Sequence, residues 1–137
     1  MQQRNGGEKQ MHDNTFEIPF KLPSLNEYIF ACRSHWANGA RMKKETQQSI
    51  LQYLRAAMYK GRLRKINGAC VVHFEWREST MRRDCDNIAS AKKYILDAMQ
   101  EAGILPNDNR RYVRGFTDTF VSADRDGVLI TIEELPI

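Results

Sequence analysis

Two aspartates separated by one residue offer the clearest chemistry in this chain. Asp84 and Asp86 lie in the segment 82–87, which reads RRDCDN. If this segment is extended, both carboxylates project from one face, and they repel each other unless a cation lies between them. Magnesium, a hard cation that prefers oxygen ligands, suits such a pair. The spacing is equally typical of a helix start, with Asp86 as the cap and Asp84 in a solvated loop.

Two further residues could join this pair. Asp108 lies in a Pro-Asn-Asp-Asn turn, where aspartate is common, but a strand returning after the turn could bring its carboxylate towards the first two. Lys93 precedes Asp97 by four residues, so the two can pair along one helix face. An ordinary surface pair is the alternative, and Lys92 beside it favours a solvated lysine.

Other common catalytic and ligand-binding patterns are absent from the sequence. It contains neither a Walker-type phosphate loop nor a serine nucleophile elbow. The histidines His12, His35 and His73 have no mutual spacing that builds a ligand set, so we expect them to be structural or solvated. The cysteines Cys32, Cys70 and Cys85 form no CxxC pair, which argues against a structural zinc site or a disulfide scaffold.

Composition predicts a compact soluble protein. The 137 residues suit one domain, and 42% apolar with 28% charged residues excludes a disordered or collagen-like chain. The net charge of +4 mildly favours a polyanionic partner. No secretory signal and no apolar stretch of membrane-spanning length occurs, so we expect a cytoplasmic protein without a membrane partner. The basic residues gather in two groups, Arg55 to Lys65 and Arg82, Arg83, Arg110, Arg111 and Arg114.

The elements that must position these residues follow from periodicity and turn signals. Residues 1–14 read as a flexible polar extension, and 22–28 as a turn through Pro23. Alternating or β-rich segments predict an edge strand over 15–20, a central strand over 70–76, and strands over 112–121 and 128–133. Helical spacing predicts amphipathic helices over 41–60 and from Asp86 or Asn87 to about Ala102. We therefore expect an α+β fold, a small mixed β-sheet packed with two main helices in a single domain, 15–137.

The segment around the aspartates resembles a known family. Arg83-Asp84-Cys85-Asp86-Asn87 is similar to the Arg-Asp-x-Asp-Asn signature of RusA Holliday junction resolvases. Residues 93–99 (KYILDAM), 103–108 (GILPND) and 22–26 (LPSLN) resemble further family marks in the expected order. Together they span roughly residues 16 to 133. Two positions depart from the family: Cys85 replaces a frequent proline or aliphatic residue, and Asn107 replaces an acid seen in relatives.

The resemblance implies an activity and a set of roles. Asp84, Asp86 and Asp108 would bind a catalytic Mg²⁺, with Mn²⁺ as a substitute, and Lys93 would be the catalytic lysine. The enzyme would act as a homodimer that cuts four-way DNA junctions by paired symmetric phosphodiester cleavage, a role often carried by prophages. The residues expected to contact DNA are Arg82, Arg83, Asn87, Arg110 and Arg111.

Two alternative hypotheses assign the protein to functional classes other than nucleases. A non-catalytic branched-DNA-binding module would bind a junction without cutting it in any divalent ion. A generic soluble protein, whose aspartates are caps and turn residues, would show neither junction binding nor an effect of metal on stability.

Overall fold

Strand β2 (Cys70–Glu78) is the centre of a four-stranded sheet with the order β1-β4-β2-β3. On one side β3 (Val113–Ser122) runs parallel to it; on the other β4 (Gly127–Glu134) runs antiparallel. The short strand β1 (Thr15–Ile18) pairs with β4 at the far edge. The sheet is therefore mixed, and the predicted edge strand, central strand and two C-terminal strands are confirmed.

The computed structural model describes residues 14–136. The predicted extension, 1–14, thus lies outside the described residues except for Asn14. Asn14 is buried, its side chain accepts a hydrogen bond from Arg64 N at 2.9 Å, and its carbonyl accepts one from Ile132 N. Asn14 therefore belongs to the folded domain, and the predicted boundary is wrong at this residue.

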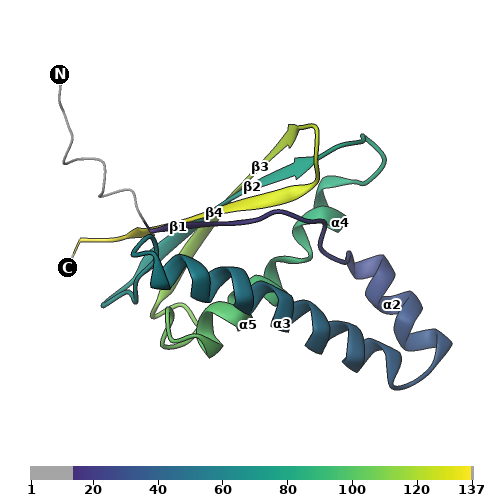
Figure 1. Ribbon diagram of the computed structural model, residues 1–137, viewed down its shortest axis with the longest axis horizontal. Helices are drawn as coiled ribbons and strands as arrows, with labels where there is room; N and C mark the ends of the chain where they lie inside the picture. Colours follow the sequence, from purple (N-terminus) through teal and green to yellow (C-terminus); the bar gives the residue numbers. More distant parts are fainter. Residues whose placement is uncertain (1–13, 137) are drawn as a thin grey trace.

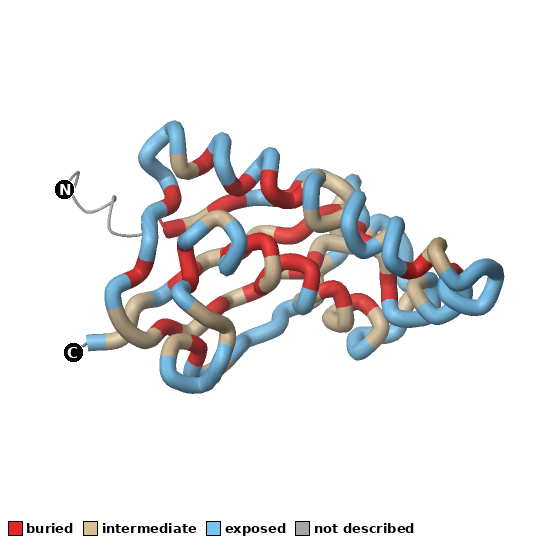
Figure 2. Tube along the Cα trace, turned by 90° about the horizontal axis from the view of Figure 1, so that it is seen from below, coloured by how far each residue is buried: buried red, intermediate tan, exposed pale blue. Residues whose placement is uncertain are grey.

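Helices cover one face of the sheet. The long helix α3 (Asn38–Tyr59) and α5 (Lys92–Glu101) pack against each other under the sheet (Figure 1). Alternate residues of β2 point into this layer, where Val72, Phe74 and Trp76 are buried. Burial of these side chains with the apolar stripes of α3 and α5 supplies the main hydrophobic stabilisation. Figure 2 shows the buried residues concentrated in the middle of the molecule.

Helix α3 matches its prediction, whereas the helix before it does not. Ile50, Leu51 and Leu54 are buried on one stripe of α3, which ends before Gly61 in the left-handed conformation (φ 77°). The segment predicted as a turn instead runs into α2 (Leu25–Ser34), a third main helix. A capping box starts it: Ser24 Oγ accepts from Glu27 N, and Glu27 Oε1 accepts from Ser24 N.

Helices α2 and α3 form a hairpin that extends past the sheet at one end of the molecule (Figure 1). Ala31 is the one buried residue of α2, so most of this helix is only partly covered. Within residues 14–136, no helix combines the length and the apolar character needed to cross a bilayer.

Candidate active site

The connection between the parallel strands β2 and β3 carries all four residues of the predicted catalytic site. Parallel neighbours require a crossover, and residues 79–112 form it with the short helix α4 (Cys85–Ala89) and α5. Asp84, Asp86, Lys93 and Asp108 all lie on this crossover. Figure 1 shows α4 near the end of β2 and α5 running back beneath the sheet.

Asp84 and Asp86 stand at the head of α4, and both are exposed. Asp84 has an extended backbone (φ −75°, ψ 153°) and occupies the N-cap position, but its side chain makes no capping bond. Asp86 lies in the first turn, so the alternative in which Asp86 is the cap is wrong. The segment is also not extended through both residues, because helix α4 begins at Cys85. Among residues 14–136, neither carboxylate has a hydrogen-bond or ion-pair partner.

The single helix predicted from Asp86 to Ala102 is divided in two by Ser90 and Ala91. Ser90 Oγ donates to Asn87 O, the carbonyl that Ala91 N would use in a continuous helix, and Ala91 N bonds to Ile88 O instead. Ser90 Oγ also accepts from Leu25 N at 2.8 Å. The hydroxyl of Ser90 therefore interrupts the helix between α4 and α5, and it also attaches the end of α4 to the start of α2.

Lys93 is the residue that joins distant parts of the crossover. Its Nζ lies 2.7 Å from Asp108 Oδ2 and 3.1 Å from Asp97 Oδ1. The hydrogen bond that Lys93 donates to Asp108, and then the one to Asp97, raises the pKa of Lys93 above its usual 10.5. An ammonium group that holds its proton this firmly is a positive charge at neutral pH and not a general base.

A cavity of about 200 Å³ opens beside Lys93. Helices α2, α3 and α5 and the α4–α5 break contribute its lining, Leu25, Tyr28, Lys43, Ser90, Lys93 and Tyr94. Lys43 thus places a second positive charge at the same cavity, a contribution that sequence spacing does not reveal. Lys43 can attract a phosphate-bearing group to this cavity, whereas the charge of Lys93 is balanced by Asp97 and Asp108.

The side chain of Arg83 forms hydrogen bonds and an ion pair that stabilise the fold. Its guanidinium binds Glu78 through two bonds, Nε to Oε1 at 3.1 Å and Nη2 to Oε2 at 2.7 Å, and Nη1 donates to Leu22 O. The side chains of Arg83 and Glu78 are only 15% and 13% exposed. This ion pair fixes the loop before Asp84 to the end of β2, so the first role of Arg83 is structural.

The other residues predicted to contact DNA are placed differently. Asn87 Oδ1 accepts a hydrogen bond from Asn26 N at 3.3 Å, so Asn87 joins α4 to α2. Arg82 is exposed before α4. Arg110 and Arg111 are exposed in the turn before β3, where Asn109 Oδ1 accepts from Arg111 N. These three arginines remain accessible to a ligand.

Lys92 is largely covered, whereas Lys93, the lysine for which a solvated surface pair was the alternative, has a 63% exposed side chain. The Lys92 side chain is 19% exposed, its Nζ lies 4.4 Å from the centre of the Phe116 ring, and it pairs with Asp118 Oδ2 at 2.9 Å. Trp76 Nε1 donates to the other oxygen of Asp118 at 2.8 Å. Strand β3 supplies Phe116 and Asp118, which sequence spacing could not place beside α5. The cluster attaches the start of α5 to the sheet.

The side chains of the acidic residues are of the kind that binds a hard divalent ion, but in this structure they are not arranged around one ion site. Asp84 and Asp86 are carboxylates of the kind that Mg²⁺ prefers, and neither is engaged by another described side chain. Asp108 is paired with Lys93. Among residues 14–136, no three His, Cys, Asp or Glu side chains are gathered so that they could hold one ion. The structure brings Asp108 to Lys93 and does not group it with both Asp84 and Asp86.

The cysteines show no metal or disulfide role in the described part of the chain. Cys32 and Cys85 are exposed, Cys70 is buried in β2, and all three are unbridged.

Comparison with known protein families and with curated proteins finds no match for this chain.

Proposed function

We propose that this protein is a magnesium-dependent endonuclease of the RusA type that resolves four-way DNA junctions. The contact between Lys93 Nζ and Asp108 Oδ2 carries the proposal. These two residues belong to separate marks of the family resemblance and lie fifteen positions apart, yet they meet on the crossover that also bears Asp84 and Asp86. This meeting of residues from two separate marks supports the proposal.

The family resemblance assigns each residue a role in this proposal. Asp84 and Asp86, with Asp108, would hold the metal ion. Bound Mg²⁺ would supply Lewis-acid polarisation of a phosphate oxygen. Lys93 keeps its proton and stabilises negative charge that develops on the phosphate during cleavage, a contribution that is large at a preorganised site.

DNA would be bound mainly through its phosphates. Arg82, Arg110 and Arg111 are exposed near the two ends of the crossover and can contact the backbone, with Lys43 beside Lys93. Asn87 and Arg83 hold the loop and helix that carry the aspartates, and any DNA contact they make is additional to that role.

A four-way junction has two-fold symmetry, so paired symmetric cuts require two sites related by the same symmetry. A homodimer is therefore part of the proposal. We also propose that the protein acts in the cytoplasm.

A synthetic four-way junction provides the test. Wild-type protein is expected to cut it in Mg²⁺ or Mn²⁺ and to stop when a chelator is added. Asp86→Asn should bind the junction at least as tightly and lose cleavage, because the neutral amide neither repels phosphate nor holds the ion. The matched control is Asp124→Asn, an exposed aspartate of the β3–β4 turn, which should cut at the wild-type rate.

The outcomes separate the alternatives. Wild-type protein that binds the junction and leaves it uncut in every divalent ion would support the non-catalytic module. If Asp86→Asn cuts at the wild-type rate, the proposed role of that carboxylate is wrong.

A further inference from the structure

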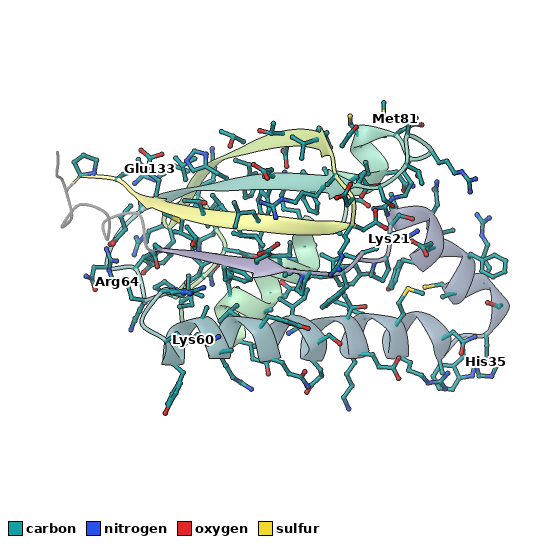
Figure 3. The ribbon with its side chains drawn as sticks, turned by 45° about the horizontal axis from the view of Figure 1, so that its top comes forward. Lys21, His35, Lys60, Arg64, Met81 and Glu133 are labelled. Atoms are coloured by element: carbon teal, nitrogen blue, oxygen red, sulfur yellow. The ribbon has the colours of Figure 1, made fainter. Side chains whose placement is uncertain are left out.

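The tip of the α2–α3 hairpin exposes large apolar side chains that the proposed active site does not use. Trp36, in the turn between the helices, is 85% exposed, and Phe30 on α2 is 73% exposed. Figure 3 labels His35 at this tip, at the end of the molecule opposite Lys60 and Arg64. Exposed aromatic residues gathered at one protruding end are typical of a binding surface.

The tip is held in a defined conformation. Ser34 Oγ donates to Phe30 O and closes the last turn of α2. His35 Nδ1 accepts from Ala37 N at 3.2 Å, and His35 O accepts from Asn38 N. The rings of His35 and Trp36 stack with centroids 5.8 Å apart and an angle of 28° between their planes. Trp36 is therefore presented to solvent from a hydrogen-bonded turn.

Close helix packing supports that turn from beneath. Gly39 at the start of α3 faces Cys32 of α2, and a Cβ at position 39 would collide with Cys32 Sγ. Only glycine allows the two helices to approach this closely.

The charge of the hairpin tip indicates the kind of partner. No Asp or Glu occurs from Tyr28 to Lys44, whereas this stretch contains four basic side chains, Arg33, Arg41, Lys43 and Lys44. Glu27 and Glu45, which flank this stretch, lie around the same groove as Phe30 and Arg41, so the surface is net basic but not free of acids. A net basic surface with exposed aromatic rings complements a polyanion that carries stacking rings.

We infer that the hairpin tip is a nucleic-acid contact at which Trp36 stacks on a base pair left unstacked at the branch point of branched DNA, while Arg33 and Arg41 bind neighbouring phosphates. This inference rests on the proposed function, because a branch point supplies the unstacked bases that an exposed indole can bind. The start of α2 is bonded to α4 through Ser90, and a ten-residue helix spans about 15 Å. The tip therefore lies within a few nucleotides of Asp86.

Binding measured without cleavage tests the inference. Fluorescence anisotropy of a labelled four-way junction, in chelator, compares wild type with Trp36→Ala and Trp36→Phe. Trp36→Ala should weaken junction binding about tenfold, the loss of one base–aromatic stack. Trp36→Phe should retain most of the affinity. Linear duplex, which has no unstacked base pair in its interior, should bind both variants almost equally.

Tyr59 provides the matched control. It is 93% exposed at the other end of α3, outside the acid-free stretch, so Tyr59→Ala should bind the junction as wild type does. Equal junction affinity for Trp36→Ala and Tyr59→Ala would overturn the inference. A change from dimer to monomer in Trp36→Ala, measured by light scattering, would also overturn it and assign the tip to contact between copies.

Failure of this inference can be told apart from failure of the proposed function. Wild-type protein that cuts the junction, beside a Trp36→Ala variant of unchanged affinity, removes only the role of Trp36. Wild-type protein that binds no DNA removes both.

Discussion

Lys93 Nζ lies 2.7 Å from Asp108 Oδ2, so a single ammonium group joins the first turn of α5 to the turn before β3. Because Asp97 binds the same ammonium from the next turn of α5, Lys93 is held between two carboxylates. This arrangement fixes the position and the charge of Lys93 before any ligand arrives.

The first prediction concerns the charge of Lys93. Lys93→Met should reduce the single-turnover rate of junction cleavage by about 10²- to 10³-fold, because a fixed positive charge near the phosphate is lost. Lys93→Arg should retain part of that rate, and Lys60→Met, at the exposed end of α3 away from the hairpin tip, should cut as wild type does. Cleavage by Lys93→Met at the wild-type rate would remove Lys93 from the mechanism.

The second prediction is the pH dependence of that effect. Bonds to Asp108 and then Asp97 raise the pKa of Lys93 above 10.5, so its charge and the stability it contributes are fully present below pH 10.5. Both are lost only as pH rises through the higher folded value. The ratio of wild-type to Lys93→Met cleavage rates should therefore stay constant from pH 7 to 10. A ratio that declines within this window would show a neutral lysine.

The third prediction concerns the ion pair of Arg83 and Glu78. Arg83→Met should lower the free energy of unfolding by about 3 kcal/mol, since it leaves a largely buried carboxylate without its partner. Chemical denaturation in the absence of DNA measures this loss. Arg82→Met, at an exposed position, should leave stability unchanged. If Arg83 serves only to bind DNA, the two variants will be equally stable.

The fourth prediction concerns Asp126, which anchors the other end of the loop before Asp84. The bond from Ser79 N to its carboxylate, at 2.7 Å, lowers the pKa of Asp126 below 3.8. A lowered folded pKa contributes stability above 3.8 that is lost as pH falls through the folded value. The stability difference between wild type and Asp126→Asn should thus be present at pH 7 and shrink towards pH 3. Asp124→Asn should show no such trend.

Much of the sheet and one long helix could be predicted because the spacing of their apolar residues matches the side that is buried in the structure. The alternation in β2 and the regular stripe of Ile50, Leu51 and Leu54 in α3 both reflect burial against one core. Helix α2 was missed because its apolar residues are mostly exposed and therefore follow no buried stripe. The capping box of Ser24 and Glu27 was the available signal.

In the candidate site, too, contacts within one helix could be predicted from the sequence, whereas contacts between distant segments could not. The Lys93 and Asp97 pair follows from helical spacing, whereas the contact of Lys93 with Asp108 was not predicted, because Asp108 was expected to approach Asp84 and Asp86. The break at Ser90 was not predictable, because it depends on a bond from Ser90 Oγ to a backbone carbonyl and another from Leu25 N, sixty-five positions away. The partners of Lys92 depend equally on β3 lying beside β2.

The two bonds that attach α2 to α4 have a mechanical consequence. Leu25 N binds Ser90 Oγ and Asn26 N binds Asn87 Oδ1, so the base of the protruding hairpin is anchored to the helix that carries Asp86. The base of the hairpin and the head of α4 therefore form one hydrogen-bonded unit, so a ligand that binds both the hairpin and Asp86 contacts two parts of a single connected framework.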